Sequence, residues 1–246
     1  MSKICIIIPV YNEALRLPKD VYFAHLRAHA FQSILFVNDG STDGSAAILD
    51  EMSAQLPEQI FTLHATKNQG KAEAVRLGFE YLMQNKNYDI LGYLDADLAT
   101  PLSQINHICY SLESNDELMM AFGSRVQLFG LDIQRKTSRH YLGRIFATYV
   151  SVLLGLQIYD TQCGAKFFRN NEILKAVFQE KFVSKWFFDI EIFIRLKVLF
   201  GKEKFQKSIL EIPLKKWHEQ GASKLKWSDF VLSPLQLSKI KKKYRK

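Results

Sequence analysis

The sequence predicts an α/β fold, in which a mostly parallel β-sheet carries helices on both faces and forms one domain. Short, continuous apolar runs alternate with segments of helical pattern through the first half of the chain. Parallel strands that are buried on both faces have this continuous apolar character. The 246 residues, with 48% hydrophobic content, contain no repeat, low-complexity stretch or flexible linker. One domain is therefore the natural interpretation.

The first half supplies most of the predicted sheet. Its apolar runs are short and rich in Ile, Leu, Val and Phe, whereas the segments between them have the spacing of helices that begin near Gly or Pro. Strands are expected at 4–9, 34–37, 60–63, 90–94 and 119–123, and helices at 18–30, 44–56, 70–84 and 101–112.

The second half changes character after a basic stretch at 134–144. The apolar segment 145–159 has no charged residue but is shorter than the roughly 20 residues of a membrane span, so a core helix or a helix on a membrane surface is expected. An aromatic-rich helix at 186–200, a strand at 209–217 and a closing helix at 227–244 follow. We predict a nucleotide-binding half at about 1–125, an acceptor half at about 126–230 and a basic C-terminal tail at 231–246.

The charge of the chain is positive and unevenly distributed. The net charge is +8, and Lys or Arg fills six of the last eight positions. This pattern is typical of a solvated tail or of a segment attracted to an anionic surface. A nucleic-acid-binding protein is disfavoured, because it would spread its basic residues over one face. The three cysteines favour a reducing compartment, and the first strand lacks the basic leader of a signal peptide, so the expected location is cytoplasmic, either free or at the cytoplasmic face of a membrane.

Asp95-Ala96-Asp97 follows the apolar run 90–94 and is the most informative motif. Two close carboxylates repel each other unless a cation lies between them, and such oxygen ligands suit Mg²⁺ or Mn²⁺, which bind diphosphates. An alternative interpretation is that Asp97 caps a helix that begins near Pro101. Ligands of parallel sheets bind beyond the carboxyl ends of the strands, where these acids are predicted to lie.

Two other predicted strands also end in polar clusters. The first runs into Tyr11-Asn12-Glu13, in which an aromatic ring stands near a carboxylate that is able to accept a hydrogen bond from a nucleobase. The second ends at 38–44, where Asp39 is a candidate for the other side of the base. The residue types there also favour a tight turn followed by a helix cap, and we expect both functions together. Lys71 opens the predicted helix at 70–84, as either an anion clamp or a solvent-exposed lysine. Neither a G-x-G-x-x-G motif nor a P-loop is present.

Taken in order, these segments resemble the family 2 glycosyltransferases, which have the GT-A fold. The resemblance is strongest to the branch that makes dolichyl-phosphate and polyprenyl-phosphate sugars, especially members that resemble dolichyl-phosphate glucosyltransferases. The similar segments are 8–13, 37–44, 68–71 with 74–78, Asp95-Ala96-Asp97, 123–125, Asp160-Thr161-Gln162-Cys163-Gly164, 186–191 and 221–224. They span residues 4 to about 240.

The resemblance implies a role for each matching position. Pro9, Tyr11, Glu13 and Asp39 would hold the nucleoside, and Lys71 would lie near its ribose and phosphate. Asp95 and Asp97 would hold Mg²⁺ or Mn²⁺ on the diphosphate, and Ser223 and Lys224 would belong to a loop that closes over it. Arg125 and Arg139 would meet the acceptor phosphate, and Asp160 would lie close to the reacting sugar.

The implied reaction moves a sugar, with UDP-glucose preferred over GDP-sugars, to a polyprenyl or dolichyl phosphate. A phosphate monoester is largely ionised near neutral pH, so positioning by Arg125 and Arg139 matters more than a strong base. Asp160 is the first candidate for a carboxylate that acts as a base or stabilises the positive charge developing on the sugar. A structural role in a turn is the alternative. Asp189 and Glu191 rank below it, because acids on an apolar helix are usually paired structurally.

Two departures from the family pattern affect these expectations. Ala99 stands where mannose-transferring relatives often carry a glutamine that also binds the metal, so fewer protein ligands reach the ion. The sequence has no transmembrane helix, so membrane contact would be peripheral or through a partner protein. A soluble saccharide acceptor, in cell-surface polysaccharide synthesis, is an alternative, and a pseudo-enzyme is disfavoured by the intact Asp95 and Asp97.

Overall fold

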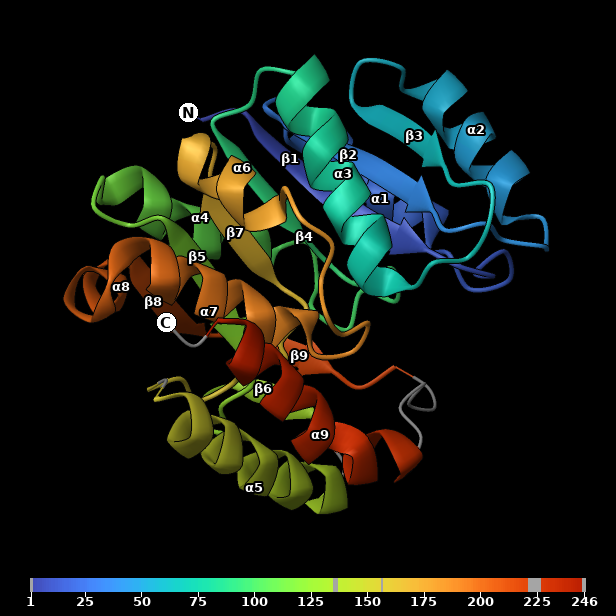
Figure 1. Cartoon of the computed structure of the whole chain (residues 1–246). Helices are drawn as coiled ribbons and strands as arrows, with labels where there is room; N and C mark the ends of the chain where they lie inside the picture. The colour runs from blue at the N-terminus through green and yellow to red at the C-terminus, as the bar shows by residue number, and fades with distance from the viewer. Residues whose placement is uncertain (1, 135–136, 156, 221–226, 245–246) are drawn as a thin grey trace.

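The strand order of the main sheet places most carboxyl ends at one edge. A computed structural model describes residues 2–134, 137–155, 157–220 and 227–244, without the side chains of 137–142, 153–154 and 227–233. The main sheet has the order β3-β2-β1-β4-β7-β5-β8 (Figure 1), and the first four of these strands are parallel. Its strands are β1 (Ile4–Val10), β2 (Gln32–Asn38), β3 (Ile60–His64), β4 (Ile90–Tyr93), β5 (Met120–Ser124), β7 (Lys166–Arg169) and β8 (Ile209–Pro213).

β7 is the antiparallel member of this sheet. It lies between β4 and β5 and runs against both, while β8 is parallel to β5. The polar segments that follow β1, β2, β4 and β5 therefore meet at one edge. Gly92 makes the central pairing possible, because a Cβ at this position would overlap the ring of Phe167 on β7.

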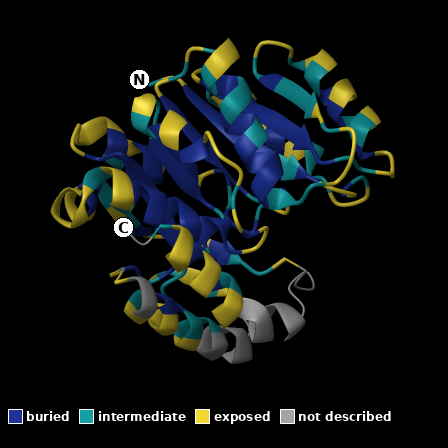
Figure 2. Ribbon diagram, in the orientation of Figure 1, coloured by how far each residue is buried: buried dark blue, intermediate teal, exposed yellow. Residues whose placement is uncertain are grey.

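Helices cover both faces of the sheet, as predicted, and side chains alternate between the two faces along each strand. Ile7 belongs to the core on one face, whereas Ile6 and Ile8 belong to the core on the other. Figure 2 shows the buried strands between the two helical layers. The first face carries α3 (Lys71–Asn85), α6 (Glu172–Phe178) and α7 (Phe188–Phe200), and the second carries α1 (Lys19–Ala28), α2 (Ser45–Gln55) and α4 (Gln104–Ser114).

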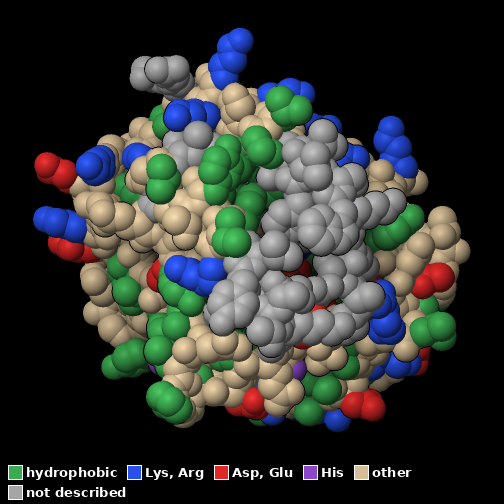
Figure 3. All heavy atoms as spheres, turned by 90° about the horizontal axis from the view of Figure 1, so that it is seen from below, with side chains coloured by type: hydrophobic (Ala, Val, Ile, Leu, Met, Phe, Trp, Pro, Cys, Tyr) green, Lys and Arg blue, Asp and Glu red, His purple; other side chains and the backbone are tan. Residues whose placement is uncertain are grey.

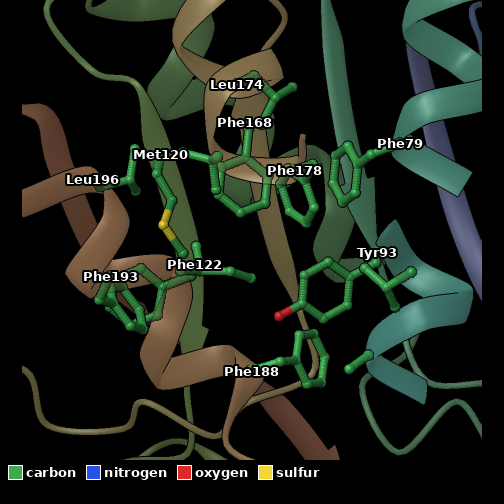
Figure 4. Close-up of a cluster of buried hydrophobic side chains, with 14 of the residues drawn as sticks. Phe79, Tyr93, Met120, Phe122, Phe168, Leu174, Phe178, Phe188, Phe193 and Leu196 are labelled. Carbon is green, nitrogen blue, oxygen red and sulfur yellow. The ribbon is translucent and has the colours of Figure 1, made fainter. Parts of the chain in front are cut away.

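An aromatic cluster fills the core under α3, α6 and α7 (Figure 4). Phe79 stacks on Phe178 with ring centroids 3.8 Å apart and meets the rings of Tyr93 and Phe168 edge-on. Tyr93 and Phe188 continue the cluster toward the edge where the strands end. The strand β4, which precedes Asp95, is therefore fixed by ring packing that is worth about 0.5–1.5 kcal/mol per aromatic pair beyond area burial.

Elements of the second half differ from the sequence expectations. The strand predicted at 209–217 is divided, because the chain leaves β8 and then forms β9 (Lys216–His218), which pairs with β6 (Asp132–Gln134) in a separate two-stranded sheet. β6, β7, α6 and a further short helix, α8 (Lys202–Ser208), lie outside the elements expected from the sequence. Each is so short that a local hydrophobic pattern barely distinguishes it from a loop.

The remaining helices are α5 (Thr137–Leu154) and α9 (Trp227–Lys243). α5 begins inside the basic stretch and ends before the predicted helix does. Among the residues that the structure describes, no helix is both long and apolar enough to cross a membrane. Lys239, Lys241, Lys242 and Lys243 lie on α9, whose Leu237 and Ile240 are buried in the core.

Candidate active site

The loop after β4 presents Asp95 and Asp97 at the edge of the sheet. The Leu98 N–H donates to the Asp95 carbonyl, and Leu98 adopts a positive φ of 51°, so the chain turns tightly here. Asp97 accepts a hydrogen bond from the Ala99 N–H at 3.0 Å. The alternative that Asp97 caps the next helix is wrong, because α4 begins at Gln104 and its cap position is Ser103.

Lys71 and Gly164 contact the carboxylate of Asp95. Lys71 Nζ lies 2.5 Å from Asp95 Oδ1. A Cβ at Gly164 would overlap the Asp95 carboxylate, so glycine is required for this approach. Burial lowers the pKa of Lys71, but the charges of Asp95 and Asp189 outweigh it and hold that pKa above its usual value. The pKa of Asp97 is raised, first by loss of hydration and then by the neighbouring charge of Asp95.

Asp39 shapes the loop that delivers Lys71 to this edge. Its carboxylate is almost fully buried and accepts hydrogen bonds from the N–H groups of Gln69 at 2.8 Å and Gly70 at 2.7 Å. Gly70 has a φ of +97° and directly precedes α3, which begins at Lys71. The contact with a nucleobase that the resemblance implies for Asp39 stays a prediction.

The loop after β1 is hydrogen-bonded to the loop after β2. The Asn12 side chain accepts from the Thr42 N–H at 2.9 Å, and the Glu13 N–H donates to Ser45 Oγ at 2.9 Å. Tyr11 is 39% exposed, so its ring is available to a ligand. Glu13 is largely buried and pairs with Arg16 at 2.9 Å. These hydrogen bonds show that the polar clusters form turns. The same turns leave the Tyr11 ring exposed, so a contact of this ring with a nucleobase stays a prediction.

Arg125 and Asp160 form a bidentate pair beyond the end of β5. Arg125 Nε lies 2.6 Å from Asp160 Oδ2, and Arg125 Nη2 lies 2.7 Å from Asp160 Oδ1. Burial lowers the pKa of Arg125, but the Asp160 charge outweighs burial and raises that pKa. The guanidinium also lies 5.4 Å from the ring of Trp217 on β9. A carboxylate that is held by a guanidinium is a weak base, so this arrangement favours Asp160 as the residue that orients Arg125.

Glu211 on β8 fixes the backbone of the Asp160 segment. Its two carboxylate oxygens accept hydrogen bonds from the N–H groups of Tyr159 at 2.8 Å and Asp160 at 2.7 Å. The sequence analysis missed this residue, although a single acid within the apolar run 209–214 was a visible signal. Through these two bonds, one strand of the sheet fixes the backbone at Asp160, whose side chain pairs with Arg125.

Replacing Glu211 by glutamine is expected to disturb this segment, because the glutamine amide accepts only one of the two bonds and turns its own N–H groups toward the other donor. We expect a loss of about 1–3 kcal/mol in unfolding free energy and a fall in transferase activity. Chemical denaturation and a transfer assay measure both, with Glu58→Gln on the exposed surface as the control. An E211Q protein that matches the control in both assays would contradict this role.

Three buried polar atoms adjoin the Arg125–Asp160 pair without a hydrogen-bond partner among the described residues. They are Ser124 Oγ, Thr161 Oγ1 and Gln162 Nε2. Buried polar atoms nearly always have a partner in the protein or in ordered water. All three belong to residues that stand within two positions of Arg125 or Asp160 in the sequence.

Beneath the edge lies a buried ion pair that ties β4, β7 and α7 together. Lys166 Nζ lies 2.5 Å from Asp189 Oδ1, which also accepts the hydroxyl of Tyr93. Lys166 donates as well to the carbonyl of Cys163, next to Gly164. Glu191 pairs with Arg195 at 2.8 Å. The prediction that Asp189 and Glu191 are structurally paired is therefore confirmed.

Three predicted positions cannot be placed in this site. Arg139 belongs to α5, but its side chain is outside the described set, and Ser223 and Lys224 lie outside the described residues altogether. Pro9 is part of β1 and pairs in register with Val37.

The donor atoms at the edge fit a hard divalent cation. No group of three or more His, Cys, Asp or Glu side chains arranged to hold a metal occurs in the described part of the chain. Asp95 and Asp97 alone would leave most positions around an ion to a ligand and to water. Mg²⁺ characteristically binds in this way, through one or two carboxylates together with phosphate oxygens and water.

Comparison with known proteins identifies the family. The sequence profile described as "Glycosyl transferase family 2" matches residues 5–178, which include the loops that carry Asp39, Asp95 and Asp160. The chain belongs to glycosyl transferase family 2. It is thus a glycosyltransferase enzyme, as predicted from the sequence.

Individual family 2 relatives cover most of the chain. A dolichyl-phosphate beta-glucosyltransferase of Trichomonas vaginalis is 30% identical over 95% of this chain and 69% of its own. That of Dictyostelium discoideum is 31% identical over 95% and 71%. A polyprenol monophosphomannose synthase of Mycolicibacterium smegmatis is 31% identical over 70% of this chain and 63% of its own.

A solved structure confirms the GT-A fold. Glucosyl-3-phosphoglycerate synthase from Mycobacterium tuberculosis, in complex with Mn²⁺, UDP and phosphoglyceric acid, matches with a TM-score of 0.70 and 14% identity. The match covers 99% of this chain and 79% of that one.

Proposed function

We propose that this family 2 enzyme transfers glucose from UDP-glucose to the phosphate of a dolichyl or polyprenyl lipid and requires Mg²⁺ or Mn²⁺. The observation that carries the proposal is the segment 160–164. Its first residue holds Arg125, and its last residue, Gly164, packs on the carboxylate of Asp95. One short segment would therefore join a site for a diphosphate and its cation to the arginine that we propose meets the acceptor phosphate.

The pairing of Asp160 supports a phosphate as the acceptor. A sugar hydroxyl needs a general base to become a nucleophile, whereas a phosphate monoester is already ionised near neutral pH. Asp160 has both oxygens on Arg125 and is poorly suited to remove a proton. A phosphate acceptor suits this site better, and the names of the relatives at about 30% identity support a lipid phosphate.

In the proposed reaction, a phosphate oxygen of the acceptor forms the new bond to the anomeric carbon, and the bond from that carbon to the diphosphate breaks. The electron pair of the broken bond leaves with UDP. Arg125 orients the attacking phosphate, and Lys71 lies where positive charge stabilises the departing diphosphate. A bound divalent cation, held by Asp95 and Asp97, adds charge stabilisation of the leaving group.

A membrane-facing surface is consistent with a lipid acceptor. Ile145, Tyr149 and Val152 form an exposed apolar stripe on α5, and Leu235 is exposed on α9. Figure 3 shows hydrophobic side chains on the underside of the molecule, with Lys and Arg around them. An apolar stripe with flanking cations is typical of proteins that rest on an anionic bilayer. We propose peripheral contact through this underside.

A thermal-shift panel tests the donor first. UDP-glucose with Mn²⁺ is expected to raise the melting temperature more than GDP-mannose with Mn²⁺ or either nucleotide-sugar without metal. At about 100 times the dissociation constant, the shift is on the order of 5–10 °C for a chain of this size. Transfer of labelled glucose to dolichyl or undecaprenyl phosphate, against oligosaccharides, then tests the acceptor. Transfer to oligosaccharides alone contradicts the lipid-phosphate proposal.

A further inference from the structure

Among the ion pairs described at the edge of the sheet, the pair of Lys71 involves a proposed metal ligand, Asp95. Asp189 is neutralised by Lys166 beneath the site, and Asp160 by Arg125 beside it. The ammonium of Lys71 forms an ion pair with Asp95. The side chain of Lys71 is about one-third exposed, so this contact lies where ligands reach it.

Packing holds the Lys71 ammonium against Asp95. Lys71 is the first residue of α3, and its Nζ lies 5.9 Å from the ring centroid of Tyr93 and 5.7 Å from that of Phe188. The aromatic faces favour a cation at this place. The carboxylate of Asp95 is confined as well, because it packs against the backbone of Gly164. A metal ion that approaches Asp95 must compete with an ammonium group already in contact with Oδ1.

We propose that Lys71 is a built-in counter-ion that occupies Asp95 in the ligand-free enzyme and opposes binding of the divalent cation until a nucleoside diphosphate arrives. The inference rests on the proposed function, in which Asp95 and Asp97 hold the cation. It adds that metal and nucleotide bind as a coupled pair.

The coupling has a simple electrostatic origin. Without nucleotide, a divalent cation binds Asp95 only by displacing the Lys71 ammonium. Lys71 is then left without its close carboxylate partner. A diphosphate offers Lys71 new oxygen partners and at the same time supplies ligands to the cation. Each ligand therefore increases the affinity for the other by the same factor, as linkage requires.

The test measures Mn²⁺ binding directly by electron paramagnetic resonance, first without nucleotide and then with saturating UDP. Lys71→Met removes the ammonium and keeps a side chain of similar length. We expect it to bind Mn²⁺ alone about tenfold more tightly than the wild type, within the about 5- to 150-fold range that is usual for such coupling. The increase in Mn²⁺ affinity caused by UDP should shrink by at least the same factor.

Two further variants make the result specific. Lys67→Met removes an equal charge from an exposed position in the same loop and should leave both affinities unchanged. Lys71→Arg keeps the charge and should retain most of the coupling. Circular dichroism confirms folding, and Lys71→Gln repeats the measurement if the methionine variant does not fold.

The outcomes separate this inference from the proposed function. If the wild type binds Mn²⁺ and UDP cooperatively but K71M binds Mn²⁺ alone no more tightly, the counter-ion role is wrong and the proposed function stands. If the wild type binds no Mn²⁺ with UDP present, or if Asp95→Asn binds it equally well, both fail.

Discussion

Replacing Asp95 by asparagine is expected to abolish metal-dependent binding of the donor while leaving the protein folded. The amide is a weaker ligand for a hard cation and deprives the ammonium of Lys71 of its carboxylate partner. We expect kcat/KM for transfer to fall at least about 100-fold, which corresponds to about 2.7 kcal/mol of transition-state stabilisation. Asp97→Asn should have an effect of similar size, because these two acids are the proposed protein ligands of the ion.

Calorimetric titration with Mn²⁺ and UDP-glucose measures the binding, and a steady-state assay measures the transfer. Asp116→Asn is the matched control, since the Asp116 side chain is 97% exposed and lies away from the site, 3.4 Å from Arg169. The variants should melt within a few degrees of the wild type in the absence of ligand. Donor binding by D95N that still depends on Mn²⁺ with wild-type affinity would refute the metal role.

Replacing Lys166 by methionine is expected to give the largest loss of stability. Lys166 is completely buried, and methionine fills its place but leaves Asp189 as a buried carboxylate without its counter-ion. Breaking a buried ion pair in this way costs about 3–5 kcal/mol. The loss also reaches the active site, because Lys166 holds the Cys163 carbonyl next to Gly164, and Asp189 accepts the hydroxyl of Tyr93, two residues before Asp95.

Chemical denaturation measures this effect, and the double variant Lys166→Met with Asp189→Asn provides the internal check. The asparagine oxygen still accepts the Tyr93 hydroxyl, so the double variant should lose less stability than K166M alone. Lys175→Met, which breaks an exposed pair with Glu172 at 3.7 Å, should cost less than about 1 kcal/mol. Equal losses for K166M and K175M would show that the buried pair contributes nothing special.

The sequence by itself determined the elements that depend on a continuous stretch of neighbouring residues. The apolar runs that became β1, β2, β4 and β5 are continuous because both faces of each strand are buried. The pair Asp95 and Asp97 was recognisable because two acids directly after a buried strand repel each other and therefore favour a cation between them. The family also followed from the sequence, since its motifs occur along the chain in a consistent order and the profile match to residues 5–178 confirms it.

Only the tertiary structure decided which distant residues meet. β7 runs antiparallel between β4 and β5, and no local pattern gives the direction of a short strand whose partners are far away in sequence. Asp95 contacts Lys71 and Gly164, and Glu211 accepts a hydrogen bond from the Asp160 N–H. Each of these contacts joins residues more than twenty positions apart in the sequence. Such contacts depend on the packing of whole elements, because charge pairing and close backbone approach are set by distance in space.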